Sequence, residues 1–154
     1  MKKDYEINLE TMAVLAKEVD GSYVAQILED DESYYVHHVT RKVIDSACRF
    51  FGSSLKGRQD GTKTVCGISH KAPISIAPSG GMYFFPTTSP QNPKCSWIAH
   101  SHVESIIKSS NEKTQVTFVN GVSILLDVSF GSLSNQLRRT AQYRYILENR
   151  LNDL

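Results

Sequence analysis

An Asn-Gly dipeptide between two alternating runs restricts the fold of this chain more than any other feature. Asn120-Gly121 separates residues 114–119 from residues 122–128, and in both runs apolar side chains occupy every second position. A period of two is typical of a strand with one buried face, and Asn-Gly is typical of a tight hairpin turn. The stretch therefore predicts an antiparallel β-hairpin.

Strand-like runs fill much of the remaining chain. Asp20-Gly21 indicates a second hairpin, between residues 5–16 and 23–28, and a third strand is expected at 33–39. Further short strands are expected at residues 62–69, 73–77, 82–85, 95–99 and 103–108, with Pro78-Ser79-Gly80-Gly81 joining the second and third of these. Residues 53–61 and 89–93 are expected as loops because they are polar or rich in proline.

Two segments have the spacing of helices. Residues 41–51 carry apolar side chains at helical intervals, with Thr40 as the expected cap at the start and Gly52 at the end. Residues 132–151 predict the one long helix, whose apolar arc consists of Leu133, Leu137, Thr140, Ala141, Leu147 and Leu151. Arg144 falls inside this arc, and we expect it to form an ion pair with Glu148 or with an acidic residue of the first strands.

These elements predict an α+β fold in a single domain over residues 1–154. We expect about ten short strands, mostly antiparallel, in a sandwich or a strongly curved sheet, because so many short strands rarely stay open. A short helix near residues 41–51 and a long C-terminal helix over 132–151 complete the fold. No run of about eighteen apolar residues is present, so we expect no membrane span. The three cysteines are widely spaced and indicate a reducing compartment, the cytoplasm.

The charge is divided unevenly along the chain, although the formal net charge is only +1. Residues 1–40 carry three lysines against nine acidic residues, whereas residues 41–71 carry seven lysines and arginines against two aspartates. The basic segment is punctuated by glycines and flanked by aromatic residues. Lysine and arginine neutralise phosphate groups and glycine lets the backbone come close, so this composition favours a nucleic-acid-binding surface.

Eleven residues are the candidate DNA contacts. Arginines and lysines supply the charge, serines supply hydroxyl groups, and histidines flank the basic segment. The candidates are Arg49, Ser53, Ser54, Lys56, Arg58, Lys63, His70, Lys71, His100, His102 and Arg139. For the three histidines, hydrogen bonding within the sheet is an equal alternative. Phe50, Phe51 and Trp97 are expected in the core and not as wedges between bases.

Metal binding and catalysis are alternatives for the same region. The potential zinc ligands are Cys48, Cys66, His70, Cys95, His100 and His102. They lack the close cysteine pair that zinc sites usually contain, so we expect no metal and no other cofactor. If residues 95–103 form one strand, His100 and His102 face opposite sides, and at most one of them can face a given cysteine. No nucleophile elbow, P-loop, Rossmann fingerprint or His-Glu-x-x-His is present, and we expect no enzyme.

Six strings in the same order resemble the ComK family of competence transcription factors of Gram-positive bacteria. They are CRFFGSS at 48–54, ISHKAPI at 68–74, FPT at 85–87, WIAHSHV at 97–103, TQVTFVNG at 114–121 and NQLRRTAQYR at 135–144. The resemblance covers residues 5–150 or so, and a series of separated matches is far more specific than any single motif. It implies a transcriptional activator of genes for DNA uptake.

The resemblance also implies how such an activator works. Members of the family bind AT-rich promoter boxes, largely through the minor groove, as at least a dimer. Double-stranded AT-rich DNA, RNA polymerase at promoters and further copies of the chain are therefore the expected partners, at the nucleoid. Arg49 and Arg58 are the first candidates for insertion into the minor groove. Tyr143, Tyr145 and Ile146 lie off the main apolar arc and are candidates for pairing between copies.

Two further expectations follow from the resemblance. Longer members of the family continue into an aromatic-rich peptide that a degradation adaptor recognises, whereas this chain ends at Leu154. Control by such an adaptor is therefore not expected to carry over. The alternative functions are a protein-interaction paralogue that has lost DNA binding and a zinc-binding β-rich protein.

Overall fold

The computed structural model describes residues 1–77 and 79–154. In chain order the elements are β1 (Thr11–Val19), β2 (Ser22–Glu29), β3 (Ser33–Val36), α1 (Thr40–Phe50), α2 (Leu55–Cys66), β4 (Ile74–Ser75), β5 (Tyr83–Pro86), β6 (Trp97–Ala99), a 3-10 turn η1 (His100–His102), β7 (Val103–Lys108), β8 (Thr114–Phe118), β9 (Ser123–Leu126) and α3 (Phe130–Asn152). The predicted α+β class with mostly antiparallel strands is confirmed. Pro78, part of an expected connection, lies outside the described residues.

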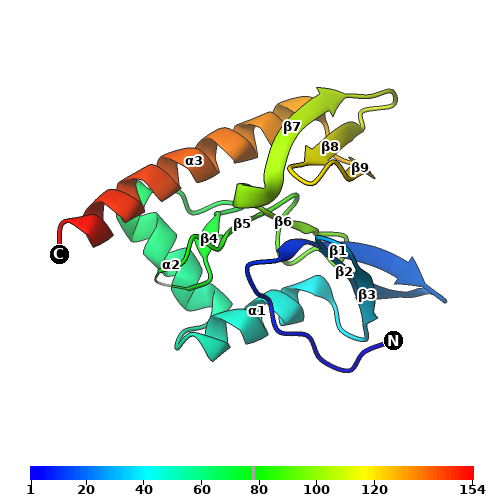
Figure 1. Ribbon diagram of the computed structural model, residues 1–154, viewed down its shortest axis with the longest axis horizontal. Coiled ribbons are helices and arrows are strands. Elements are labelled where there is room, and N and C mark those ends of the chain that lie inside the picture. Colours follow the sequence, from blue (N-terminus) through cyan, green and yellow to red (C-terminus); the bar gives the residue numbers. More distant parts are fainter. Residues whose placement is uncertain (78) are drawn as a thin grey trace.

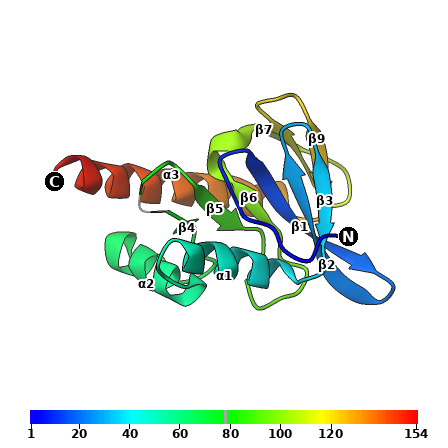
Figure 2. The same cartoon turned by 60° about the horizontal axis from the view of Figure 1, so that its bottom comes forward.

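The strands form two sheets. A six-stranded sheet has the order β3-β2-β1-β6-β5-β4, and a three-stranded sheet has the order β7-β8-β9. The pairs within both sheets are antiparallel. Helix α1 lies along one side of the larger sheet, and the small sheet and α3 lie on the other (Figure 1). Figure 2 shows α2 beside α3, at the end of the molecule away from the β1–β2 hairpin.

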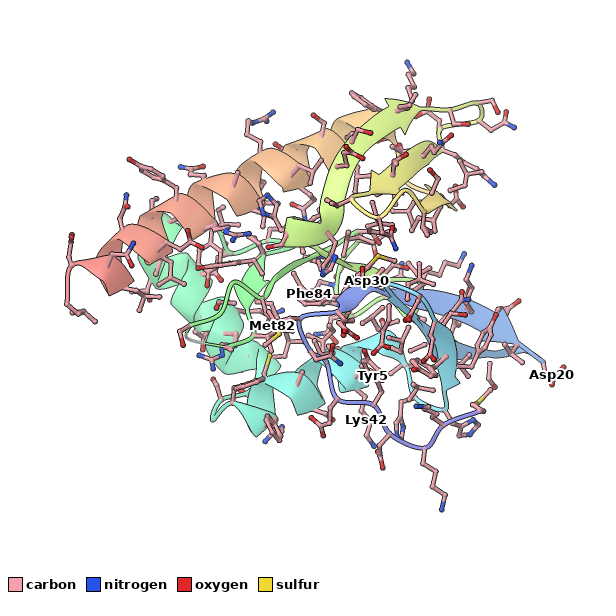
Figure 3. All side chains as sticks on the ribbon, viewed as in Figure 1. Tyr5, Asp20, Asp30, Lys42, Met82 and Phe84 are labelled. Carbon is pink, nitrogen blue, oxygen red and sulfur yellow. The ribbon has the colours of Figure 1, made fainter. Side chains whose placement is uncertain are left out.

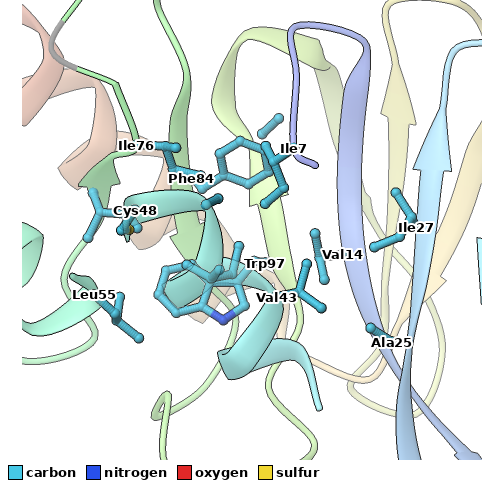
Figure 4. Packing of buried hydrophobic residues seen from close by; sticks show 14 of the residues in the cluster. Ile7, Val14, Ala25, Ile27, Val43, Cys48, Leu55, Ile76, Phe84 and Trp97 are labelled. Atoms are coloured by element: carbon cyan, nitrogen blue, oxygen red, sulfur yellow. The ribbon is translucent and has the colours of Figure 1, made fainter. Parts of the chain in front are cut away.

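The alternation of side chains along β1 and β6 gives the molecule two apolar clusters. Val14 and Trp97 face α1 and belong to one cluster, part of which Figure 4 shows. Ala13 and Ile98 face the other way, toward the small sheet and α3. Successive residues of a strand point to opposite faces, so the same two strands contribute to both clusters.

Both predicted hairpins are confirmed, but the turn at Asn120-Gly121 is longer than expected. Gly121 has a φ of 92°. Its N–H donates to the carbonyl of Phe118 at 2.9 Å, and the N–H of Phe118 donates to the carbonyl of Val122 at 2.8 Å. The loop is therefore three residues long, 119–121, and only its glycine has a positive φ. The side chain of Asn120 donates to the carbonyl of Asp30 at 2.8 Å, which ties this turn to the β2–β3 turn.

The prediction of a loop at 53–61 followed by a strand at 62–69 is wrong, because α2 occupies residues 55–66. The hydroxyl oxygen of Ser54 accepts from the N–H of Gly57 at 3.0 Å, and Gly67 ends the helix in the left-handed conformation with a φ of 78°. A glycine within a helix costs about 1 kcal/mol relative to alanine. Caps at both ends, with Leu55 and Thr62 buried, outweigh the two glycines of this helix.

The ends of two other predicted elements are corrected. Thr40 does not cap α1, since Val39 is the capping residue and the buried Thr40 hydroxyl donates to the carbonyl of Cys95 at 2.6 Å. The first strand begins at Thr11 and not at Tyr5. The tyrosine lies in the preceding segment, where its hydroxyl bonds the Thr11 hydroxyl at 2.6 Å.

Helix α3 confirms the long C-terminal helix, but its buried stripe differs from the predicted arc. The buried residues are Leu133, Gln136, Thr140 and Tyr143, whereas Ala141 is exposed. The predicted ion pair of Arg144 is confirmed, with its Nε 2.9 Å from a carboxylate oxygen of Glu148. The expectation that Tyr143 is free to pair with another copy is wrong, because it packs edge-on against Tyr83 of β5 with ring centroids 5.7 Å apart. Within the described residues, no helix is long and apolar enough to cross a membrane.

Candidate nucleic-acid interface

Helix α2 and two loops surround a hollow that is lined by three lysines. Lys56 and Lys63 lie seven residues apart and hence on one side of α2. The loop at 69–72 and the turn at Ser89-Pro90 close the hollow, whose volume is about 340 Å³. We call this the basic hollow; its lining residues are Lys56, Gln59, Asp60, Lys63, Ser69, His70, Lys71, Ala72, Ser89 and Pro90.

Four of the sequence-predicted contact residues, Lys56, Lys63, His70 and Lys71, line the basic hollow. A single carboxylate in the hollow, that of Asp60, lies 3.4 Å from the Lys56 ammonium. Both partners of this pair are largely exposed, at 82% and 67%. An ion pair in that setting is weak, so it leaves the lysine able to meet another anion. The arrangement can therefore hold phosphate groups.

One acidic residue of the N-terminal part lies far from this region. Figure 3 shows Asp20 at the tip of the β1–β2 hairpin, at the opposite end of the molecule from α2. The carboxylate at this tip is therefore remote from the lysines of the basic hollow.

The two arginines proposed as minor-groove readers lie outside the basic hollow. Arg49 of α1 is 67% exposed, and its Nε donates to the carboxylate of Asp45 at 2.8 Å. Arg58 of α2 is half-buried and donates to the carbonyl of Phe51 at 3.0 Å. Its Nε is buried and has no partner within the described part of the chain. Arg49 is accessible to a ligand, whereas Arg58 is held by the fold.

The predicted serines and Arg139 take structural positions near the basic hollow. Ser54 caps α2. Ser53 is half-buried in the turn before α2. Its Oγ packs against Gly57, and a Cβ at position 57 would lie only 2.5 Å from this oxygen. Arg139 of α3 directs its guanidinium group to the side chain of Gln136 and to the carbonyl of His70.

His100 and His102 are not part of the basic hollow. They lie in the 3-10 turn between β6 and β7, so the single strand in which they would face opposite sides does not form. His102 Nε2 is 2.8 Å from the carbonyl of Leu9, and it lines a separate hollow of about 120 Å³ together with Arg144. Burial of His100, and next the positive charge of Arg144, lower the pKa of the imidazole.

The three cysteines are free thiols that are buried or half-buried. Cys48 and Cys95 are fully buried, and burial raises the pKa of the Cys48 thiol to about 11. Cys66 is half-buried, and all three thiols are free. Among residues 1–77 and 79–154, no three His, Cys, Asp or Glu side chains lie together as a metal site. The zinc-binding alternative therefore gains no support from the fold.

Two of the predicted core aromatic residues are confirmed and one is wrong. Trp97 is fully buried and Phe51 packs against the same apolar cluster. Phe50, in contrast, is 67% exposed at the end of α1, where its ring meets that of Phe51 edge-on. Helical spacing separates these neighbours, because Phe51 follows the buried Ala47 by four residues and Phe50 falls at the edge of the buried side.

The fold adds residues to the site that sequence reasoning missed. Gln59, Ser69 and Ser89 also line the basic hollow, and Gln136 binds its loop from α3. The signal for Gln59 was its spacing of four from Lys63 on one helix, which was lost once the segment was assigned as a loop. No local signal connects Ser89 with residues some thirty positions earlier.

The chain thus forms an α+β protein with a lysine-lined hollow beside α2. The chain belongs to the ComK family, since the family model described as ComK protein matches residues 2–152. It is 42% identical over 149 residues to a protein of Bacillus subtilis (strain 168) named as a competence transcription factor, covering 97% of this chain and 78% of the relative. No solved structure matches. The family and this relative support a regulator of transcription in competence.

Proposed function

We propose that this protein activates competence genes by binding AT-rich promoter DNA, with phosphates of the duplex seated in the basic hollow. The observation that carries the proposal is the meeting of Lys56 and Lys63 from α2 with His70 and Lys71 from a separate loop. They come from a helix and from the loop that follows it, and all four side chains line a space of about 340 Å³. Each phosphate that they neutralise releases counterions from the duplex, which favours binding at low salt.

Phosphate contacts supply affinity and register, so sequence preference needs a second element. Arg49 is suited to this role because its guanidinium group is exposed and is held by one surface ion pair. An AT-rich minor groove is narrow and strongly negative, and arginine can leave a surface carboxylate for it. Arg58 is less suited, because it would have to give up its bond to the Phe51 carbonyl.

The proposal includes the partners and place that the family resemblance implied. The protein acts in the cytoplasm at the nucleoid, as a homodimer or higher homo-oligomer that brings RNA polymerase to promoters. A palindromic or repeated DNA site requires at least two copies of the reading surface. Tyr145 is 70% exposed on α3 and remains available for pairing between copies.

We predict that Lys63→Ala and Lys71→Ala each weaken binding to an AT-box duplex several-fold. Each should also reduce the slope of log affinity against log salt by about one, because one phosphate contact per bound copy is lost. Gel-shift titrations at two salt concentrations measure both quantities. Lys108→Ala is the matched control, since Lys108 is an exposed lysine of β7 outside the basic hollow.

The same titrations with a GC-rich duplex test the sequence preference. We expect tighter binding to the AT-box duplex, and Arg49→Ala should narrow the difference between the two duplexes. Equal binding to both duplexes by the wild-type protein would reject the AT-specific activator. No salt-dependent binding to either duplex would favour the paralogue that regulates through protein contacts alone.

A further inference from the structure

Gln136 is a fully buried polar residue that contacts the loop of the basic hollow. It lies on α3 and is 1% exposed, among the largest fully buried side chains of the molecule. Its Nε2 donates to the carbonyl of Lys71 at 3.0 Å and to the carbonyl of Pro86 at 2.7 Å, and its Oε1 accepts from Arg139. Burying an amide is costly unless its groups are hydrogen-bonded. Here both ends of the amide have partners.

These bonds hold one wall of the basic hollow. Gln136 binds the carbonyl of Lys71, and Arg139 binds the carbonyl of the preceding residue, His70. Two successive carbonyl groups of the loop are therefore directed to α3, while the side chains of both residues line the hollow. The amide of Gln136 also binds the end of β5, so the loop is fixed relative to the six-stranded sheet.

The loop needs this support because its backbone is strained. Lys71 has a φ of 50°, in the left-handed region that side chains other than glycine rarely adopt. Such a conformation persists only where surrounding contacts enforce it, and it occurs often at binding sites. Lys71 is half-buried. The bonds from α3 thus oppose relaxation of the backbone, which would swing this lysine away from Lys56 and Lys63.

We propose that Gln136 and Arg139 are positioning residues for phosphate binding. They hold His70 and Lys71 in the strained turn that presents both side chains to the hollow, and Arg139 acts through this loop without touching DNA. The inference rests on the proposed function, because it assumes that the basic hollow receives DNA phosphates. It gives Arg139 a different task from the direct contact expected from sequence.

A double-mutant cycle tests the part played by Gln136. Gln136→Met keeps the volume of the side chain but removes its hydrogen bonds, and Gln142→Met is the matched control at an exposed position of the same helix. We expect Gln136→Met to weaken binding to the AT-box duplex about as much as Lys71→Ala. Combining the two should add little, since both disable the same lysine. Lys56 lies on α2 and is not held by α3. When Gln136→Met is combined with Lys56→Ala, the two fold-losses in DNA affinity should therefore multiply.

Arg139→Lys tests the part played by the arginine and does not depend on a buried substitution. Lysine keeps the positive charge but lacks the fork that reaches both the Gln136 side chain and the His70 carbonyl. A positioning role predicts that Arg139→Lys binds DNA as weakly as Arg139→Ala. Binding close to wild type by Arg139→Lys would show instead that the charge itself meets DNA, and would overturn the proposal for this residue.

The outcomes separate the inference from the proposed function. If the losses of DNA affinity multiply when Gln136→Met is combined with Lys71→Ala, the positioning role of Gln136 is rejected. This holds even if the lysine variants weaken binding as expected. If Lys56→Ala, Lys63→Ala and Lys71→Ala all bind as wild type does, the basic hollow is not the DNA site and both proposals fall. Thermal melting of each variant shows whether a loss of binding comes from unfolding, and Arg139→Lys decides the matter if Gln136→Met does not fold.

Discussion

Burial and neighbouring charge set the properties of single side chains such as His100. Its ring is half-buried, and its Nδ1 lies 3.5 Å from the guanidinium Nη1 of Arg144. Burial disfavours a charged imidazole and Arg144 repels it, while the charge of Glu148 opposes them in part, and the pKa of His100 falls below 6.5. The unfolded chain therefore takes up a proton at this histidine more readily than the folded protein does.

We predict that this difference makes the fold less stable in mild acid. The stability due to neutral His100 is fully present above pH 6.5, the ordinary pKa of a histidine. It is lost as the pH falls toward the lower pKa of His100 in the folded protein. The melting temperature should drop between pH 7.5 and pH 5.5, about one pH unit either side of that value. His100→Gln should reduce the drop, and His37→Gln, at an exposed site, should not. If the melting temperature of His100→Gln drops as much as that of the wild type, His100 is not the source of the acid sensitivity.

The junction between α1 and α2 depends on one carboxylate. Asp45 of α1 accepts from the backbone N–H of Leu55 at 2.8 Å and from the Nε of Arg49 at 2.8 Å. Burial by itself would raise the pKa of Asp45, but these hydrogen bonds and the charge of Arg49 outweigh it and lower the pKa. Asp45 thus satisfies the first N–H of α2, which Ser54 does not reach, and connects the helix of the basic hollow to the core.

We expect Asp45→Ala to lower the free energy of unfolding by about 1–3 kcal/mol at neutral pH, the usual cost of losing a charge-assisted hydrogen bond. The contribution is present above the ordinary aspartate pKa of 3.8 and is lost as the pH falls through the lower folded-state value. Urea unfolding at pH 7 and pH 3 measures it. Asp127→Ala, at an exposed position, is the control. An equal loss for Asp45→Ala at both pH values would show that its charge is not involved.

Over the whole molecule, strands β1 and β6 connect the two apolar clusters. Trp97 lies in the cluster under α1, and Phe118 of the small sheet lies in the other. Both side chains are fully buried. Since neighbouring residues of the same strands face the two clusters, loss of one cluster should disturb the strands that support the other. The two halves should therefore unfold together.

We predict that Phe118→Ala lowers stability by about 3–5 kcal/mol, the usual cost of emptying a buried phenylalanine site. The single tryptophan, Trp97, reports on the opposite cluster. Its fluorescence and the far-ultraviolet circular dichroism should shift to lower urea together, as one transition. Val119→Ala, in the same hairpin but 63% exposed, should change little. A fluorescence transition that stays at its wild-type midpoint would show that the clusters fold independently.

Local patterns in the sequence were sufficient for the hairpins, the first and last helices and the pair of Arg144 with Glu148. These features depend on residues close together in the chain, where turn chemistry, periodicity and a spacing of four act directly. Helix α2 was missed although its caps, Ser54 and Gly67, are also local. The polar composition of residues 53–61 favoured a loop, whereas the caps at Ser54 and Gly67 were the better indicator of the helix.

The sequence by itself determined the mostly antiparallel architecture and the presence of a basic, glycine-containing segment. Only the tertiary structure decided which of its charges act together. Lys56 and Lys63 meet His70 and Lys71 because α2 packs beside the loop that α3 holds, whereas Arg58 turns to a backbone carbonyl. The sequence does not distinguish Gln136 from the other polar residues of α3. Packing buries it, and its amide connects α3 to the Lys71 loop and to the end of β5. Such contacts join distant parts of the chain, so their partners are set by packing and not by local pattern.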